Sequence, residues 1–248
     1  MNEPQRLKLR HIVPSLVTVF AICAGLTSLR MSIEGNIEFA LYFILLAVFL
    51  DAADGKLARF LDTASPFGAE LDTLADFFNF GIVPGVLIYN TLYIGTDHAN
   101  LGWLATMVLA VCCGLRLARF NLSTKAADVA LKKDDHFVGV PAPALACLAL
   151  MPVFMYLHGW DKTDFPLLRA AYIIGVGMLA VSTIPTFSIK HASIKRAHLP
   201  FAVIGAVVLV VCLMVYPWPT LILANSLYLL SLPLPYLVQL RQNNTPSD

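Results

Sequence analysis

The stretch DAADGKLARFLDTASPFGAELDTLAD (residues 51–76) lies at the junction of two long apolar segments and carries four aspartates. These are Asp51, Asp54, Asp72 and Asp76. Carboxylates are costly inside a membrane and usually mark function there. The first two are three residues apart and the last two are four apart, so each pair shares one face of a helix. Because Ser65-Pro66 between the pairs predicts a turn, we expect two helices to fold back on each other and all four carboxylates to converge.

Converging carboxylates repel one another strongly unless cations neutralise them. Oxygen ligands alone suit hard divalent ions such as Mg²⁺ or Mn²⁺. Four carboxylates are enough to hold two ions, and a two-metal site suits phosphoryl-type transfer because it can hold both the attacking and the leaving oxygen. The alternative is a structural network of salt bridges with Lys56 and Arg59, although two cations cannot neutralise four acids.

Small and basic residues beside the acids predict a place for a phosphorylated ligand. Gly55 and Gly68 leave room for another group to approach the backbone. Ala58 lies one helical turn beyond Asp54 and keeps the same face open. Arg59 offers a planar guanidinium to a phosphate.

This stretch resembles the signature of the CDP-alcohol phosphotransferase family. The signature reads D, two residues, D-G, two residues, A-R, eight residues, G, three residues, D, three residues, D, and every spacing is met. Eight specified positions within 26 residues make the match highly specific. Three further segments resemble the membrane-integral phosphatidylserine synthases of bacteria within that family, at residues 67–89, 114–121 and 137–146. The likeness extends over about residues 12–186.

The resemblance implies a role for each matched residue. Asp51, Asp54 and Asp72 would be metal ligands, and Asp76 would be the general base and also touch a metal. The nucleotide of CDP-diacylglycerol would bind against a second set: Asp54, Gly55, Ala58, Arg59 and Gly68. The resemblance further implies L-serine as the acceptor, phosphatidylserine and CMP as the products, and a homodimer.

The composition indicates a membrane protein. Of 248 residues, 58% are hydrophobic and 13% are charged, against about 25% charged in an average soluble domain. The mean hydropathy of +0.73 fits many membrane spans. A net charge of +1 gives no basis for binding nucleic acid. The five cysteines lie in apolar segments without a CxxC pair, so they predict neither a disulfide framework nor a zinc site.

We predict an all-α, polytopic transmembrane helix bundle, since a span needs about 20 apolar residues. About eight spans are expected, at 12–31, 37–60, 68–94, 100–122, 141–158, 166–187, 200–216 and 218–237. The chain divides into a basic juxtamembrane segment, a six-helix core and an additional C-terminal hairpin, at 1–11, 12–187 and 200–237. A hairpin that does not fully cross is the alternative for the last two spans. The longest polar connection is expected at residues 123–140.

The distribution of lysine and arginine predicts the orientation. With the N-terminus inside, only Arg30, Lys162 and Arg169 of the 17 basic residues fall on the outer side. Both termini are therefore expected in the cytoplasm, and the aspartates would lie near the cytoplasmic side of the cell's inner membrane.

Two polar residues within the spans are candidates for contact with substrate. Thr18 lies in the first span, where bonding of its hydroxyl to the helix backbone is the alternative. Asn79 follows Asp76 on the same helix face and can orient that carboxylate or touch substrate. A hydrogen bond between packed helices is the alternative for Asn79.

Three polar residues end the fourth predicted span: Arg116, Arg119 and Asn121. The two arginines share a helix face, and their guanidinium groups suit a diphosphate or a carboxylate. Snorkelling to lipid headgroups is the alternative interpretation.

Two other functions are compatible with the acidic stretch. The same fold could use another acceptor alcohol, namely choline, glycerol phosphate or inositol phosphate. A cation transporter could line its pathway with the four acids, but Arg59 beside them argues against such a pathway.

Overall fold

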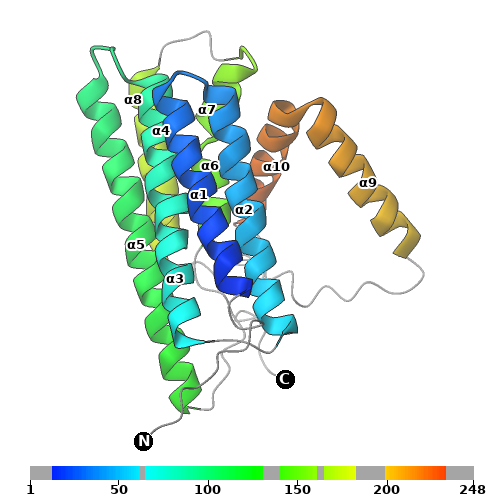
Figure 1. Cartoon of the computed structure of the whole chain (residues 1–248). Coiled ribbons are helices and arrows are strands. Elements are labelled where there is room, and N and C mark those ends of the chain that lie inside the picture. Colours follow the sequence, from blue (N-terminus) through cyan, green and yellow to red (C-terminus); the bar gives the residue numbers. More distant parts are fainter. Residues whose placement is uncertain (1–12, 62–64, 131–139, 161–164, 183–198, 233–248) are drawn as a thin grey trace, which may run out of the picture.

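The computed structural model of the chain is an assembly of helices (Figure 1). The structure describes residues 13–61, 65–130, 140–160, 165–182 and 199–232. Within these ranges, the side chains of residues 58–59, 124–130, 199–203 and 206 are not described. No strand occurs in the described ranges, which confirms the predicted all-α fold class.

Helices α1 (Val13–Ile33) and α2 (Ile37–Phe60) form an antiparallel pair (Figure 1). Gly35 in the connecting turn has a φ of 80°, a conformation that glycine adopts without a steric penalty. The buried face of α1 consists mostly of small residues, which let the helices approach closely. Ser28 adds a hydrogen bond across the pair, from its Oγ to the Ala40 carbonyl oxygen at 2.7 Å.

Helix α3 (Pro66–Asp76) begins with a defined cap. The Ser65 Oγ accepts a hydrogen bond from the Gly68 N–H at 3.0 Å. Pro66 occupies the first turn, where backbone N–H groups have no partner within the helix, so proline costs no hydrogen bond there. The predicted turn at Ser65-Pro66 is therefore the start of a helix that returns alongside α1 and α2.

The same rod continues through the π-helical segment η2 (Phe77–Ile82) into α4 (Val83–Leu92). A π turn contains one residue more than an α turn, and such turns are frequent at functional sites. Pro84 follows immediately and has no N–H to donate to the preceding turn. The regular α-helical bonding of the rod is thus interrupted directly after Asp76.

Helix α5 (Ala99–Ala130) packs against α8, η2 and α4. The predicted polar connection at residues 123–140 is wrong in its first part, because residues 123–130 continue α5. Their sequence, STKAADVA, contains three alanines and lacks glycine and proline, so no residue in it strongly opposes a helix despite its polarity. Residues 131–139 lie outside the described part of the chain.

Helices α6 (Ala142–Ala149) and α7 (Met151–Leu157) form one rod interrupted near Pro152, and α8 (Pro166–Val181) packs beside α5 and α6. Pro152 cannot donate to the Leu148 carbonyl four residues earlier. The Tyr172 hydroxyl of α8 donates to that oxygen instead, at 2.9 Å.

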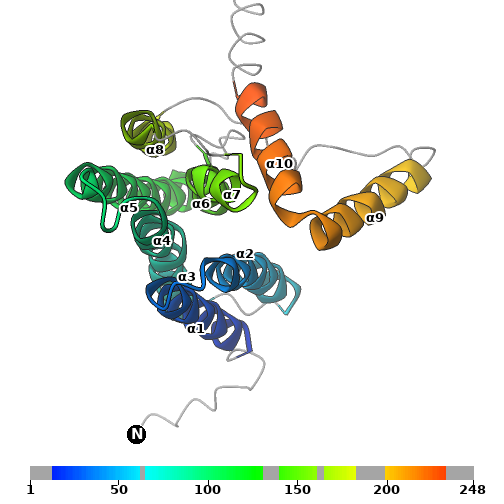
Figure 2. The ribbon, with the colours of Figure 1, turned by 90° about the horizontal axis from the view of Figure 1, so that it is seen from above.

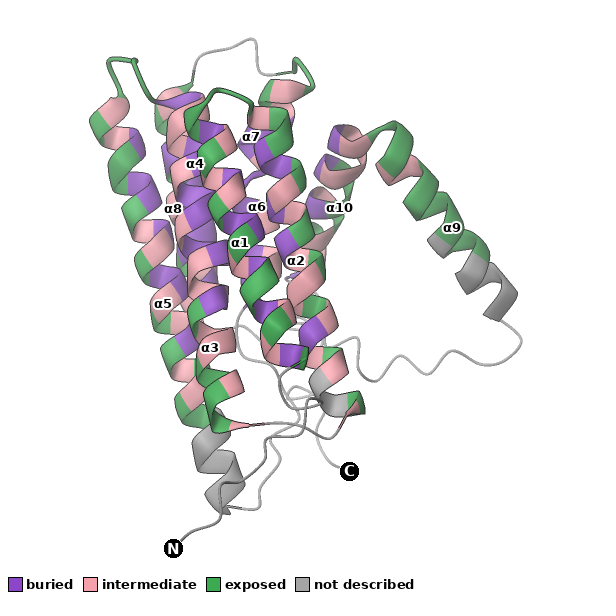
Figure 3. Ribbon diagram, viewed as in Figure 1, coloured by how far each residue is buried: buried purple, intermediate pink, exposed green. Residues whose placement is uncertain are grey.

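Helix α10 (Pro217–Ser231) rests on this rod, while α9 (Leu199–Val215) extends away from the bundle (Figures 1 and 2). The Asn225 side chain of α10 donates to the Cys147 carbonyl oxygen at 2.8 Å. The described residues of α9 are largely exposed (Figure 3), and most of their side chains are apolar. Such a surface suits contact with lipid tails, which are as apolar as leucine.

Three rods among the described residues are long and apolar enough to cross a bilayer: Val13–Ile33, Pro66–Leu92 and Ala99–Ser123. Two shorter apolar stretches of helix accompany them, Ala142–Leu157 and Pro166–Val181. These helices fit a membrane-integral protein. The count of about eight spans remains a prediction.

Candidate metal centre

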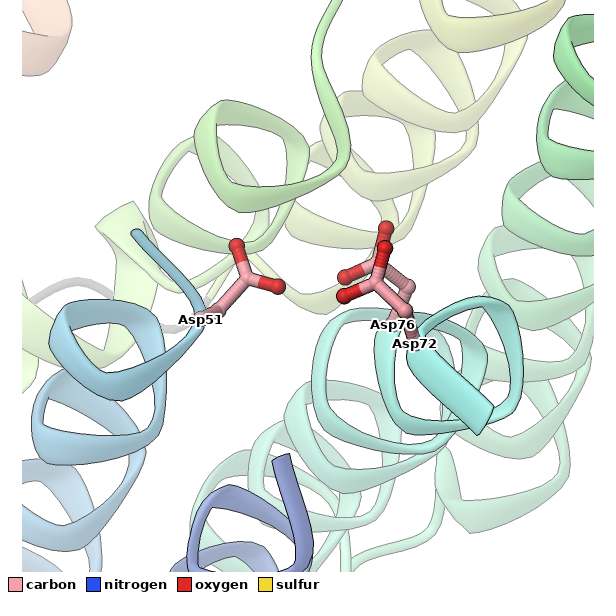
Figure 4. Close-up of side chains that lie close together, drawn as sticks. All are labelled: Asp51, Asp72 and Asp76. Atoms are coloured by element: carbon pink, nitrogen blue, oxygen red, sulfur yellow. The ribbon is translucent and has the colours of Figure 1, made fainter. Parts of the chain in front are cut away.

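The site lies where the second half of α2 faces α3. Asp51 on α2 is directed toward Asp72 and Asp76 on α3 (Figure 4). One carboxylate oxygen from each of the three lies within 4.8 Å of the other two. Asp72 and Asp76 share a helix face because they are one turn apart, and the turn at Ser65 brings that face to Asp51. We refer to Asp51, Asp72 and Asp76 as the acidic triad.

The fourth aspartate is held separately. Asp54 is only 4% exposed, and its Oδ2 accepts a hydrogen bond of 2.7 Å from the Thr18 hydroxyl of α1. The Thr18 Oγ1 also lies 3.2 Å from the Pro14 carbonyl oxygen, the expected backbone partner. The structure therefore brings three of the four predicted carboxylates together, and it directs Thr18 to the fourth.

The charges and unused oxygens of these acids fit a divalent cation. Asp54 Oδ1 and Asp76 Oδ1 are buried and have no hydrogen-bond partner among the described residues. A buried carboxylate without compensation is costly, and oxygen ligands suit Mg²⁺ or Mn²⁺. Lys56 is exposed and forms no ion pair with the acids, so the structure gives no support for its part in a salt-bridge network.

Besides Asp54, four residues were predicted to bind the nucleotide. A Cβ atom added to Gly55 would meet no heavy atom of the described residues within 4 Å, so space is open beside it in this part of the structure. A Cβ added to Gly68 would lie 3.1 Å from the Ser65 Oγ, so the small size of Gly68 also serves the start of α3. The side chains of Ala58 and Arg59 lie outside the described part of the structure.

Asn79 is placed against α1. It lies within the π turn, is 1% exposed, and its Oδ1 has no hydrogen-bond partner among the described residues. A Cβ atom added to Gly25 would overlap that oxygen. Neither the π turn nor the role of Gly25 was predicted, and Pro84 is a local signal of irregular helix in this stretch.

Arg116 on α5 lies close enough to Asp76 for the two charges to interact, although they form no ion pair. Its Nε is buried and has no hydrogen-bond partner among the described residues. Arg116 thus combines an unused donor with a position near the acidic triad.

Arg119 and Asn121 are engaged with neighbouring helices. The Arg119 guanidinium donates to the carbonyl oxygens of Val181 and Ser182, at 2.7 and 3.1 Å, and so satisfies the end of α8. The Asn121 Nδ2 donates to the Thr73 hydroxyl of α3 at 3.1 Å. The structure therefore gives these two side chains roles in placing α8 and α3.

Two family models match the chain. Residues 11–184 match the model described as CDP-alcohol phosphatidyltransferase. Residues 199–233 match a second model, CDP-alcohol phosphatidyltransferase 2. The first match contains α1 to α8 and all four aspartates.

Curated relatives carry related names. The chain is 37% identical over 187 residues to the CDP-diacylglycerol–serine O-phosphatidyltransferase of Mycobacterium leprae, covering 74% of this chain and 61% of that protein. It is 33% identical over 186 residues to the protein of the same name from Bacillus subtilis, covering 74% and 94%. It is 31% identical over 181 residues to the archaetidylserine synthase of Methanothermobacter thermautotrophicus, covering 72% and 69%. The matches thus span less than two thirds of the mycobacterial relatives.

Proposed function

Because the chain belongs to the CDP-alcohol phosphatidyltransferase family, we propose that it transfers the phosphatidyl group of CDP-diacylglycerol to L-serine. The products are phosphatidylserine and CMP. The observation that carries the proposal is the acidic triad between α2 and α3, with Asp54 buried beside it. Relatives named for serine, at 31–37% identity, favour serine over choline, glycerol phosphate or inositol phosphate.

The proposed reaction requires one proton transfer. The serine hydroxyl oxygen forms a bond to the phosphorus that carries diacylglycerol, and the bond from that phosphorus to the CMP oxygen breaks. A neutral hydroxyl is a poor nucleophile, so a nearby base must accept its proton. We assign this role to Asp76, whose Oδ1 is buried and without a hydrogen-bond partner among the described residues.

The remaining acids suit a metal-binding role. Asp51, Asp54 and Asp72, with Asp76, would hold two Mg²⁺ or Mn²⁺ ions. Divalent ions bound there would offset the charge of the diphosphate and stabilise the phosphate of CMP as it leaves. The open side of Gly55 supports a nucleotide position next to α2, and Asp54, Ala58 and Arg59 of α2 with Gly68 of α3 complete the proposed site.

Arg116 is the proposed partner of the serine carboxylate. Arg116→Gln is expected to raise the KM for serine about 10- to 100-fold, because a charge-assisted hydrogen bond contributes about 1.5–3 kcal/mol. Arg116→Lys should restore little, since lysine lacks the planar fork of donors. Initial rates measured against serine, at saturating CDP-diacylglycerol, give the result.

Arg30→Gln is the matched control for Arg116. Arg30 lies in the last turn of α1, at the end of that helix away from Asp54, and forms an ion pair with Glu34 at 2.8 Å. Loss of the Arg30 charge should leave the KM values for serine and for CDP-diacylglycerol unchanged. A rise in the KM for CDP-diacylglycerol alone, with the serine KM unaltered, would show that Arg116 binds the diphosphate instead.

The choice of acceptor has a direct test. Purified full-length protein is incubated with CDP-diacylglycerol and, separately, with labelled L-serine, choline, glycerol 3-phosphate and inositol phosphate. We expect label in the lipid fraction with serine only, accompanied by release of CMP. Labelling by a different alcohol, or by none, would overturn the proposed function.

We further propose a site near the cytoplasmic face of the inner membrane, within about eight spans and with both termini inside. The support is the concentration of lysine and arginine at one set of helix ends. The family resemblance also implies a homodimer, which we include in the proposal.

A further inference from the structure

Thr18 and Asp54 form a buried hydrogen bond between helices far apart in sequence. The donor is on α1 and the acceptor on α2, 36 residues away, at 2.7 Å. The two residues are 5% and 4% exposed. A hydrogen bond from a hydroxyl to a buried carboxylate gains strength from the low local dielectric.

The geometry restricts both partners. A threonine hydroxyl has one proton, and its Oγ1 lies closer to Asp54 Oδ2 than to the Pro14 carbonyl, at 2.7 against 3.2 Å. The branched Cβ of threonine limits the side chain to few rotamers in a helix. Thr18 therefore holds one oxygen of Asp54 in a defined position, which also sets the direction of the other oxygen.

The other oxygen of Asp54 is available for a ligand. Oδ1 is buried and has no hydrogen-bond partner among the described residues. The charge of Asp51 acts on Asp54, and the charge of Asp54 acts on Asp72, so Asp54 belongs to the same electrostatic cluster as the acidic triad. Asp54 also has a hydrogen bond with the Gly55 backbone, but neutral donors alone do not compensate a buried carboxylate, whereas a cation next to Oδ1 would.

We propose that Thr18 is a positioning residue for the metal site, which orients Asp54 so that Oδ1 can bind a divalent ion beside the acidic triad. Groups that orient metal ligands typically change metal affinity about 10- to 100-fold when removed. The inference rests on the proposed function only in taking Asp54 as a metal ligand. It does not depend on which alcohol is the acceptor.

The test measures Mn²⁺ binding directly, without either substrate. Full-length protein in detergent is titrated with Mn²⁺, and the free ion is followed by electron paramagnetic resonance. Thr18→Val, which keeps the shape and removes the hydroxyl, is expected to weaken Mn²⁺ binding about 10-fold or more. Thr18→Ser keeps a hydroxyl and should bind Mn²⁺ nearly as well as the unmodified chain.

Two controls separate positioning from packing. Thr27→Val removes a hydroxyl from the same helix that donates to the Cys23 carbonyl oxygen at 2.8 Å, and it should leave Mn²⁺ binding unchanged. On an Asp54→Ala background, Thr18→Val should weaken Mn²⁺ binding no further, because the two changes act through one ligand. Unaltered Mn²⁺ affinity in Thr18→Val, or an equal loss in Thr18→Ser, would overturn the proposal.

The same titration distinguishes this inference from the proposed function. Suppose that serine is not incorporated into lipid, but that Thr18→Val still has no effect on Mn²⁺ affinity in the Asp54→Ala background. That result would reject serine as the acceptor and keep the positioning role of Thr18. If serine is transferred but Thr18→Val and Asp54→Ala lower Mn²⁺ affinity additively, the positioning role of Thr18 is rejected and serine remains the acceptor.

Discussion

Asp76→Asn is expected to lower turnover about 10²- to 10⁴-fold, the usual contribution of general acid–base catalysis. The amide has the shape of the carboxylate but cannot accept the serine proton. It keeps one oxygen as a ligand, and Asp51 and Asp72 remain in place within the acidic triad, so Mn²⁺ should be largely retained. Steady-state turnover and Mn²⁺ binding, measured on the same preparation, test both halves of the prediction.

Two further aspartates serve as references for this variant. Asp72→Asn should lose Mn²⁺ as well as turnover, and anomalous scattering from Mn²⁺-soaked crystals of the two variants would show the difference. Asp97→Asn changes an exposed aspartate between α4 and α5 and should alter neither property. Normal turnover of Asp76→Asn would remove Asp76 from the role of base.

Gly25→Ala is expected to destabilise the protein by about 1–3 kcal/mol or more, the usual cost of overpacking a filled interior. The new Cβ would overlap the Asn79 Oδ1 and lie 3.1 Å from the Phe78 Cε1. Asn79 is 1% exposed and cannot move aside into solvent. Because Asn79 belongs to the π turn that follows Asp76, turnover should fall together with the melting temperature in detergent.

The matched control for Gly25 is Gly175→Ala on α8. A Cβ there would meet no heavy atom within 4 Å among the described residues, and alanine favours a helix interior over glycine by about 1 kcal/mol. This control should therefore melt at the same temperature or higher. Adding Asn79→Ala to Gly25→Ala should recover part of the lost stability, and a Gly25→Ala protein that melts like the unmodified chain would disprove the clash.

The acidic triad was predictable because its determinants are local. Spacings of three and four residues place aspartates on one helix face wherever the helix lies, and Ser65-Pro66 combines residues that are favoured at the first positions of a helix. The structure agrees for Asp51, Asp72 and Asp76. The same reasoning did not anticipate that one oxygen of Asp54 accepts a hydrogen bond from a hydroxyl on another helix.

The two arginines show the limit of reasoning from one helix. Arg116 and Arg119 share a face of α5, and their sequence context gave both the same predicted role. In the structure, Arg119 donates to the carbonyl oxygens of Val181 and Ser182 at the end of α8, whereas the Nε of Arg116, near Asp76, has no hydrogen-bond partner in the part of the chain that the structure describes. What separates them is the position of α8, which no local pattern specifies.

The sequence by itself determined the helical class, the apolar character and the pairing of aspartates on two neighbouring helices, since these follow from composition and residue spacing. Only the tertiary structure decided three contacts: Thr18 donates to Asp54, the Asn79 side chain packs against Gly25, and Arg119 donates to the carbonyl at the end of α8. Each of these contacts joins residues from different helices. Their partners are set by how the helices pack, a global balance of many weak contacts that no single segment encodes.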